Sequence, residues 1–570
     1  MSTPAPRPLL ATASIAVALA AADTYVVVLA LTDMMAGVGL GVDALQRATP
    51  IISGFLLGYV AVLPLIGRIA DLSSRQRVLL WCLAIFVVGS AVTALATDLP
   101  TLVAGRVVQG VGGGGLVPAT LAIVADLWPA DRRGMPLGVV GAVQELGSVL
   151  GPLLGAAVLA VSDWRMIFWL NAILGVVLAV LIVRTGGGLG ARPRWGPLVV
   201  TAVGLAVTGL ALAAPDALTT SVSLGLPFVP FGDATARLLT PIGVLGLLLV
   251  ALALVLWVRP ALPVLRRSDL LGAVLVATAL GAVILTFAAA DPAREVVGPL
   301  GYVLLPVAAL ATLAYAVHHR RSSAPLIPRG LVRGRALVAL VVSLSVGVAL
   351  VAVVVDVPLL ARLIHTDSET GAALVLVRFL VAVPVGALLG GWLLRPLGDG
   401  AVATVGLAAA SVGLFVMATW GRGSLDTVAS TLILALVGVG VGLALAPVNN
   451  AALAQAPEEA HGTISALVVV ARMVGMVVGL ALLTAIGLHQ YYDAVAQIPD
   501  RTDTAALVDA AIVQVHWVFR GAGVAAAVGA LVALGLGLRR HSLRPPPPRP
   551  WRRITRTQRE GSPQGSPRTR

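Results

Sequence analysis

The chain contains about sixteen apolar runs of roughly 20 residues, separated by short breaks rich in charge, proline or glycine. An α-helix needs about 20 apolar residues to cross the ~30 Å hydrocarbon core of a bilayer. Strands of a membrane barrel would instead appear as alternating segments of about 10 residues. The runs therefore predict an all-α polytopic membrane protein with about sixteen spans.

The predicted spans fall into three groups, and we expect two six-helix halves joined by extra helices. The runs lie at about 10–32, 49–67, 78–97, 101–125, 136–160 and 165–184; at 197–214, 239–258, 269–290 and 298–317; and at 336–357, 371–394, 401–420, 427–449, 462–487 and 516–538. The predicted units are an N-terminal half (1–190), a linker with four additional helices (191–335), a C-terminal half (336–540) and a disordered Arg/Pro-rich cytoplasmic tail (541–570). The outer loop between the last two runs can extend both helices beyond the membrane.

The charge pattern gives an orientation and excludes some partners. Only 11% of residues are charged, against about 25% in soluble domains, and the net charge is +13. The arginines gather in alternate loops, as the positive-inside rule requires of cytoplasmic loops, so the excess does not indicate a nucleic-acid partner. We therefore predict a multi-pass membrane protein with both termini cytoplasmic. Cys82 is the only cysteine, so neither a disulfide framework nor a thiolate metal site is expected, and no cofactor is predicted.

Five charged residues lie inside predicted spans: Asp23, Arg106, Glu145, Arg378 and Arg472. Such charges cost a few kcal/mol each, so they are more often functional than not. At ~1.5 Å per residue, Glu145 and Arg472 lie at a similar depth on opposite halves and are expected to meet. We hypothesise that Asp23 and Glu145 carry protons and that Arg106 and Arg472 bias them. The alternative is an inert structural cluster of ion pairs.

Two glycine-containing motifs accompany these charges. Gly67, Asp71 and Arg75 occupy a short inner turn, whose acid and arginine would form contacts that break when the bundle rocks, so they predict a gate. Gly147, Gly151, Pro152 and Gly155 follow Glu145 and combine a bare face for close helix contact with a proline kink.

Other polar residues are given smaller roles. The spans place Asn449, Asn450 and His461 in an inner loop, where only solvation is expected, and Asp356 at a helix end as a cap or vestibule charge. No arrangement typical of an enzyme is present, so the chain is not predicted to be one.

These motifs resemble those of the major facilitator superfamily. Gly67, Asp71 and Arg75 match its first inner-loop signature, although Leu72 and Ser74 depart from it; Arg106, Gln109 and Gly110 resemble its arginine–glutamine–glycine motif; and the glycine–proline stretch after Glu145 resembles its antiporter motif. The first helix and the segment 268–332 look like those of the fourteen-helix drug:proton antiporter branch. The two runs at 197–258 are additional to that pattern. This resemblance implies two six-helix halves, proton coupling, export and a place in the bacterial inner membrane.

Within that superfamily the chain is similar to mycobacterial exporters of triacylglycerides and drugs. Asp23-Thr-Tyr-Val-Val-Val, Gln144-Glu145-Leu-Gly-Ser-Val-Leu-Gly-Pro and Arg472-Met-Val-Gly-Met carry this likeness. It implies a proton-coupled exporter of lipophilic or amphipathic substrates, with a lipid such as triacylglyceride favoured and a periplasmic lipid-carrying lipoprotein as a partner. A monomer is expected. The alternatives are a multidrug:proton antiporter and, from another class, a non-transporting membrane scaffold.

Overall fold

The computed structural model describes residues 6–40, 45–186, 195–220, 225–232, 237–288, 300–366, 368–499 and 503–537. These residues form helices and connecting turns, with no strand among them, so the predicted all-α class is confirmed. The predicted disordered tail, 541–570, lies outside them. The long helices are α1 (Pro6–Gly37), α2 (Leu45–Leu72), α3 (Arg75–Ala94), α4 (Leu99–Leu127), α5 (Gly134–Leu159), α6 (Trp164–Thr185), α7 (Trp195–Ala213), α10 (Pro241–Arg267), α11 (Leu270–Ala288), α12 (Gly301–Arg321), α13 (Arg335–Ile364), α14 (Glu369–Leu397), α15 (Asp399–Met417), α16 (Val428–Gln455), α17 (His461–Ala496) and α18 (Thr504–Ala533).

Thirteen helices are long and apolar enough within the described residues to cross a membrane. The described apolar stretches of α7 and α10 are shorter, Val199–Ala213 and Pro241–Ala253. Together with α1, these helices correspond to the sixteen predicted runs. Several ends differ from the prediction: α1 runs from Pro6 to Gly37 and α17 continues to Ala496, past the predicted runs.

The last helices show these differences. The end of α16 at Gln455 places Asn449 and Asn450 within a helix, so their assignment to a loop was wrong. His461 is buried in the first turn of α17 rather than solvated in a loop. α17 continues to Ala496 and α18 begins at Thr504, so the segment between them does extend both helices.

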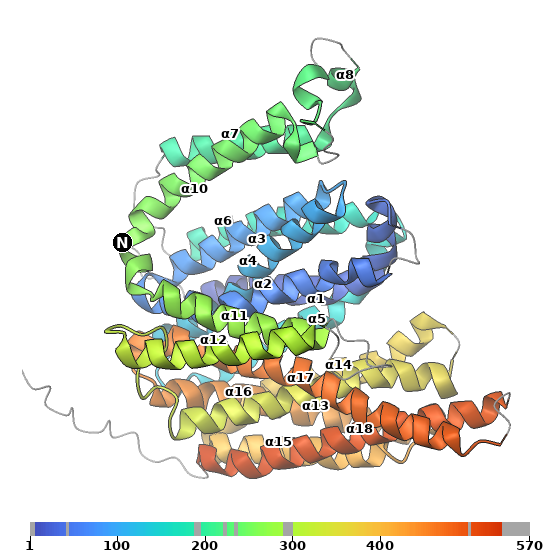
Figure 1. Cartoon of the computed structure of the whole chain (residues 1–570). Coiled ribbons are helices and arrows are strands. Elements are labelled where there is room, and N and C mark those ends of the chain that lie inside the picture. The colour runs from blue at the N-terminus through green and yellow to red at the C-terminus, as the bar shows by residue number, and fades with distance from the viewer. Residues whose placement is uncertain are drawn as a thin grey trace, which may run out of the picture.

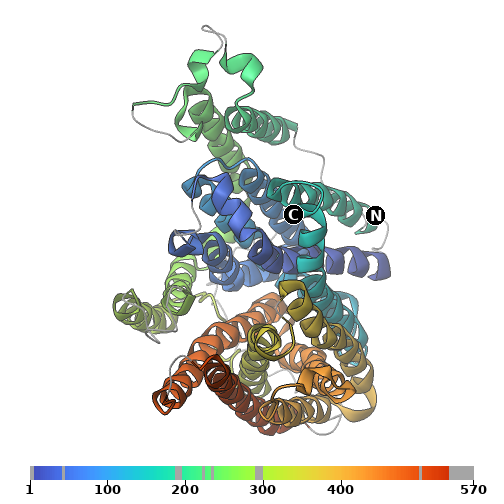
Figure 2. The same ribbon diagram turned by 90° about the vertical axis from the view of Figure 1, so that its right-hand side faces the viewer.

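The helices form two bundles, shown in Figures 1 and 2. Helices α1–α6 pack against one another, as do α13–α18. Of the connecting helices, α11 packs on α2 and on α17 and so touches both bundles, while α12 covers α11. Helices α7 and α10 pair with each other and stand beside the first bundle, with α10 making a limited contact to α2.

Glycine makes α4 the central helix of the first bundle. The glycines of α4, Gly110 and Gly112 to Gly115, are typical of a face for close helix packing, and α2 and α3 pack on this face. A Cβ at Gly105 would lie 2.6 Å from the Thr93 hydroxyl, and Gly110 and Gly114 lie directly against the backbone of α2 at Phe55 and Tyr59. Three backbones can approach this closely only without side chains between them.

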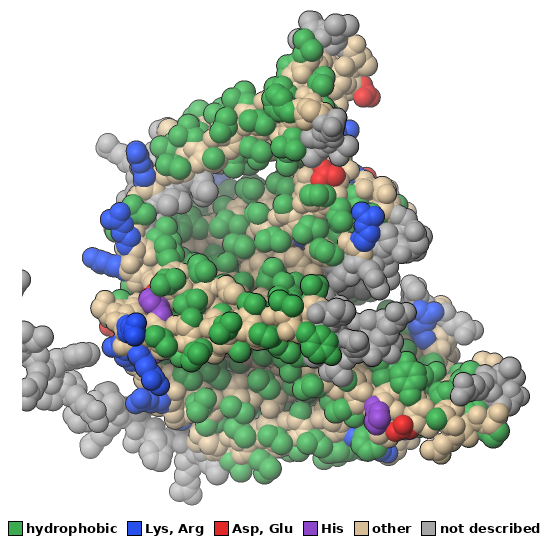
Figure 3. Space-filling view, in the orientation of Figure 1, with side chains coloured by type: hydrophobic (Ala, Val, Ile, Leu, Met, Phe, Trp, Pro, Cys, Tyr) green, Lys and Arg blue, Asp and Glu red, His purple; other side chains and the backbone are tan. Residues whose placement is uncertain are grey.

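The bundle has one arginine-rich end, visible at the left of Figure 3. The arginines that the helix ends bring there include Arg68, Arg75, Arg77, Arg132, Arg133, Arg184, Arg266, Arg267, Arg320, Arg321, Arg329, Arg333, Arg335 and Arg395. Apolar side chains cover the flank between the two ends, as a bilayer requires.

Candidate functional site

Asp23 on α1 is held inside the first bundle by three polar partners. Arg106 Nη1 on α4 donates to Asp23 Oδ2 at 2.5 Å, while Gln109 Nε2 and Asn171 Nδ2 donate to Asp23 Oδ1 at 2.9 and 2.6 Å. Asp23 and Arg106 are each 1% exposed. A buried charge pair is stable only when its remaining donors and acceptors are also satisfied, and this carboxylate meets that condition.

The arginine of this network is equally well enclosed. Arg106 also donates to Gln109 Oε1 at 2.7 Å and to the Ile51 carbonyl at 3.3 Å, and its guanidinium lies over the rings of Phe55 and Phe168, 4.4 and 5.7 Å from their centroids. Asp23 and Arg106 were singled out from the sequence because a charge inside the membrane is costly. The sequence did not point to Asn171 or to Ser90, whose Oγ accepts from Gln109, because neutral polar residues are common inside membrane helices.

Glu145 and Arg472 connect the two bundles. Arg472 Nη1 on α17 lies 3.4 Å from Glu145 Oε1 on α5, and each side chain is 9% exposed. The depth estimate therefore predicted this meeting correctly. The contact is longer than the Asp23–Arg106 pair, and no further hydrogen bond to Glu145 joins it within the described part of the chain. A single long bond leaves this carboxylate weakly held compared with Asp23.

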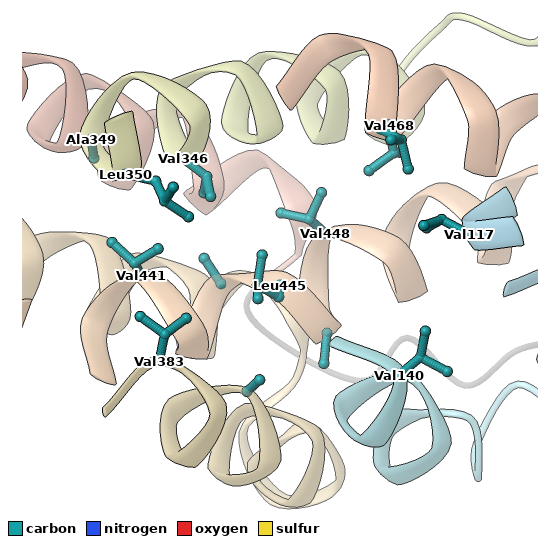
Figure 4. Close-up of a cluster of buried hydrophobic side chains, with 14 of the residues drawn as sticks. Val117, Val140, Val346, Ala349, Leu350, Val383, Val441, Leu445, Val448 and Val468 are labelled. Atoms are coloured by element: carbon teal, nitrogen blue, oxygen red, sulfur yellow. The ribbon is translucent and has the colours of Figure 1, made fainter. Parts of the chain in front are cut away.

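A narrow cavity of about 20 Å³ lies next to this bridge, which is room for about one water molecule. Its polar side chains are those of Gln144, Ser343, Asn449 and Arg472. Its other walls are mainly apolar side chains from both bundles, and Figure 4 shows Val117 and Val140 from the first bundle facing Val346, Leu445, Val448 and Val468 from the second. The cavity is thus mainly apolar with a few polar groups, and in this conformation it is far smaller than a ligand pocket of about 300–1,000 Å³.

Asp71 joins the bundles at the arginine-rich end. From the last turn of α2, its carboxylate accepts the backbone N–H groups of Gly462 and Thr463 at 2.6 and 2.9 Å and the Thr463 hydroxyl at 2.6 Å. It therefore caps the N-terminus of α17, where an anion is favoured. Gly67 permits this approach, since a Cβ there would lie 2.6 Å from the Gly462 carbonyl oxygen.

Two further contacts close the same end. Arg75 forms an ion pair with Asp126 and donates to the carbonyl oxygens of Ala122, at 3.2 Å, and Glu458, at 2.8 Å. Helices α5 and α14 also meet through glycine, since a Cβ at Gly138 would lie 2.7 Å from the Ala387 carbonyl oxygen. The predicted gate residues are thus brought together with the second bundle.

The glycine stripe of α5 packs on α1. Gly147, Gly151 and Gly155 lie against Ala18, Ala22 and Val26 in turn, and Pro152 lies within the helix. This contact holds the helix of Glu145 against the helix of Asp23. The stripe therefore packs within the first bundle.

Arg378 and Asp356 lie outside the acid–arginine pairs described above. Arg378 on α14 is half-buried and donates to the Leu425 carbonyl at 3.3 Å and the Thr431 hydroxyl at 3.2 Å, so among the described residues it has no acidic partner. Asp356 lies within α13 and is 3% exposed, so its expected position at a helix end was wrong.

The two bundles meet at a buried ion pair and are joined at one end by the contacts of Asp71 and Arg75. This is the architecture of a membrane transporter. Comparisons with known proteins agree. The major facilitator superfamily model matches residues 13–480. The chain is 38% identical over 496 residues to a triacylglyceride transporter of Mycolicibacterium hassiacum, covering 84% of this chain and 78% of that protein. It is 35% identical to the triacylglyceride transporter of Mycobacteroides abscessus, covering 84% and 82%.

Solved structures show the same fold. The human organic anion transporter MFSD10 (TETRAN) matches with a TM-score of 0.57 at 15% identity, covering 93% of this chain and 100% of that one. The proton:xylose symporter XylE matches with a TM-score of 0.54 at 14% identity, covering 92% and 94%. The chain belongs to the major facilitator superfamily, as its motifs predict, and it is a multi-pass membrane transporter rather than an enzyme.

Proposed function

We propose that this transporter exports a neutral lipid such as triacylglyceride in exchange for protons. The Glu145–Arg472 pair carries the proposal, because it bridges the two bundles beside a cavity with mainly apolar walls. Protonation of Glu145 removes the charge that attracts Arg472, so binding a proton loosens the contact between the halves. The names of the mycobacterial relatives support a triacylglyceride substrate.

Asp23 and Arg106 form the second part of the proposed proton path, and Asp71 with Gly67 and Arg75 forms the gate. The gate closes the arginine-rich end, which we place in the cytoplasm on the positive-inside rule. Both termini then lie inside, and the protein resides in the bacterial inner membrane. The six-helix halves at 1–190 and 336–540, the linker at 191–335, the monomeric state and the lipoprotein partner stay predictions.

The direct test is transport by purified protein in proteoliposomes. With an imposed proton gradient, wild type should move a fluorescent triacylglyceride, and Glu145→Gln and Asp23→Asn should each lose proton-driven movement. Asp131→Asn is the control, because that side chain is 58% exposed and lies outside the helices. Full activity in both variants would refute the assigned proton path.

Multidrug:proton antiport is the second candidate, because Glu145 is a carboxylate beside an apolar cavity and could attract a lipophilic cation. Mass spectrometry of co-purifying lipids separates the two. Abundant triacylglyceride supports the first proposal. Its absence, together with proton flux stimulated by a lipophilic cationic dye, supports drug export. If neither substrate moves, both substrate proposals fail.

A further inference from the structure

Asp356 is a buried carboxyl group that the proposed proton path does not use. It lies in α13, eight residues before the helix ends at Ile364, and is 3% exposed. Its Oδ2 atom has no hydrogen-bond partner, and neither oxygen forms an ion pair within the described part of the chain. Asp23, on the first helix of the other bundle, receives three donors. The first helix of each bundle therefore carries a buried acid. Asp23 is surrounded by hydrogen-bond donors, whereas Asp356 Oδ2 has none.

The packing of α13 on α18 shows which residues of α18 lie at the depth of Asp356. Residues 345, 349, 352 and 356 share one face of α13 at intervals of three and four. Ser345 on this face packs against Gly529 of α18, where a Cβ would lie 2.7 Å from the Ser345 Cβ. Because α13 and α18 run antiparallel, the residues of α18 at the depth of Asp356 lie about eleven positions before Gly529. Val518 and Phe519 occupy that level and are buried.

The charged and titratable groups nearest this level on α13 and on the helices packed against it are engaged elsewhere or exposed. Arg378 on α14 donates to Leu425 and Thr431, and His516 on α18 contacts the Trp420 carbonyl oxygen at 2.6 Å. Arg520 is exposed and lies over the ring of Trp517. Arg362 on α13 is also exposed and is engaged in another interaction. On α17, His489 and Asp493 lie 3.6 Å apart and are exposed, and α16 contributes no charged side chain to this level.

An ionised carboxylate in such a place would have neither solvent nor a counter-ion. The cost of burying an isolated charge far exceeds that of binding a proton, so the group is stable at this position only as the neutral acid. A neutral acid inside a helix that must move during transport can release its proton once water reaches it. A purely structural acid would keep its proton in every state.

We propose that Asp356 is an additional proton-binding site, in the C-terminal bundle, which holds a proton in this conformation and releases it to water when the helices packed around α13 move apart. This site rests on the proposed proton-coupled transport. The proton passes between the carboxyl group and water, and no other reactant is needed.

Infrared spectroscopy of the full-length protein in nanodiscs tests proton binding without any transport. At neutral pH we expect a carbonyl band of a protonated carboxylic acid that shifts in heavy water, disappears in Asp356→Asn and returns in Asp356→Glu. Asp23→Asn, in which an ion-paired acid is changed, should retain the band. Identical spectra of wild type and Asp356→Asn in this region would overturn the proposal.

Transport then decides whether the proton is exchanged. We expect Asp356→Asn to lower proton-driven accumulation by about tenfold or more, within the usual range of coupling between two sites, while substrate counterflow without a gradient is retained. Unchanged proton-driven accumulation would show that Asp356 is a structural acid and overturn the proposal. If wild type itself shows no proton-driven transport, the proposed function fails, and the infrared result still decides proton binding at Asp356.

Discussion

At the scale of single residues, the two acid–arginine pairs differ in how firmly each is held. Asp23 lies within hydrogen-bond distance of Arg106, Gln109 and Asn171, whereas Glu145 has one long contact to Arg472. A carboxylate with several donors is rigid, and one with a single weak donor exchanges partners at lower cost. We therefore infer that Asp23 organises the first bundle and that Glu145 responds to the state of the transporter.

Asp23→Asn should destabilise the protein far more than Glu145→Gln. It leaves Arg106 buried without an anion, and breaking a buried pair in this way costs roughly 3–5 kcal/mol of unfolding free energy. Thermal unfolding in detergent measures the difference. The double variant Asp23→Asn/Arg106→Gln should recover part of the loss, because the unpaired charge is gone. Equal melting temperatures for Asp23→Asn and Glu145→Gln would contradict this ranking.

Asp269, in the turn between α10 and α11, gives a prediction about pH. Burial alone would raise the pKa of Asp269, but hydrogen bonds from His318 and from the backbone N–H groups of Gly272 and Leu326 outweigh it, so the net pKa shift is downward. The lowered pKa stabilises the fold above the ordinary aspartate pKa of about 3.9, and this stabilisation is lost as the pH falls through the folded value. Asp269→Asn should have a lower melting temperature than wild type at neutral pH. The difference between the two melting temperatures should shrink as the pH falls. A gap that does not depend on pH would show that these hydrogen bonds to the ionised carboxylate do not stabilise the turn.

At the scale of elements, glycine decides which helices can touch. The stripe on α5 lets α1 approach until Gly147 and Gly151 lie against the backbone of Ala18 and Ala22. Gly141 on the same helix has looser surroundings, since a Cβ there would lie 3.6 Å from the Leu445 Cβ, an ordinary contact. Glycines of one helix thus differ: Gly147 and Gly151 lie in tight helix contacts, whereas Gly141 lies in a loose one.

This difference supplies a matched pair of variants. Gly151→Ala should lower the unfolding free energy by roughly 1–3 kcal/mol, the usual cost of overpacking, because the new methyl group meets the Ala22 carbonyl oxygen. Gly141→Ala should be nearly neutral. Melting temperatures of the two variants provide the measurement, and a similar loss in both would mean that helix contact does not distinguish the sites.

At the scale of the whole molecule, a few polar contacts at the arginine-rich end add to the helix packing between the two bundles. Asp71 caps α17 from α2, and Arg75 reaches the Glu458 carbonyl oxygen from α3. These contacts join residues that lie far apart in the sequence, one in each half of the chain. Because they are few and lie at the edge of the bundle, their loss should shift the balance between states rather than unfold either bundle.

Asp71→Asn should open this end. Hydrogen bonds to a charged group contribute about 1.5–3 kcal/mol, which corresponds to roughly a 10- to 100-fold shift in population. In a Cys82→Ser background, a single cysteine at Val468 beside the cavity should react with a water-soluble maleimide correspondingly faster. The exposed Asp131→Asn is the control. An unchanged rate in Asp71→Asn would show that this carboxylate does not hold the gate.

Hydropathy, motifs and residue spacing were enough to predict the class of protein, the number of long helices and the depth of the charges. Length, hydropathy and a rise of ~1.5 Å per residue are local properties, and they sufficed to predict that Glu145 and Arg472 meet. They did not give the full set of partners of Asp23 on α4 and α6, the cap that Asp71 places on α17, or the isolation of Asp356. Those depend on how helices distant in the sequence rotate and pack against one another, and only the tertiary structure decides that.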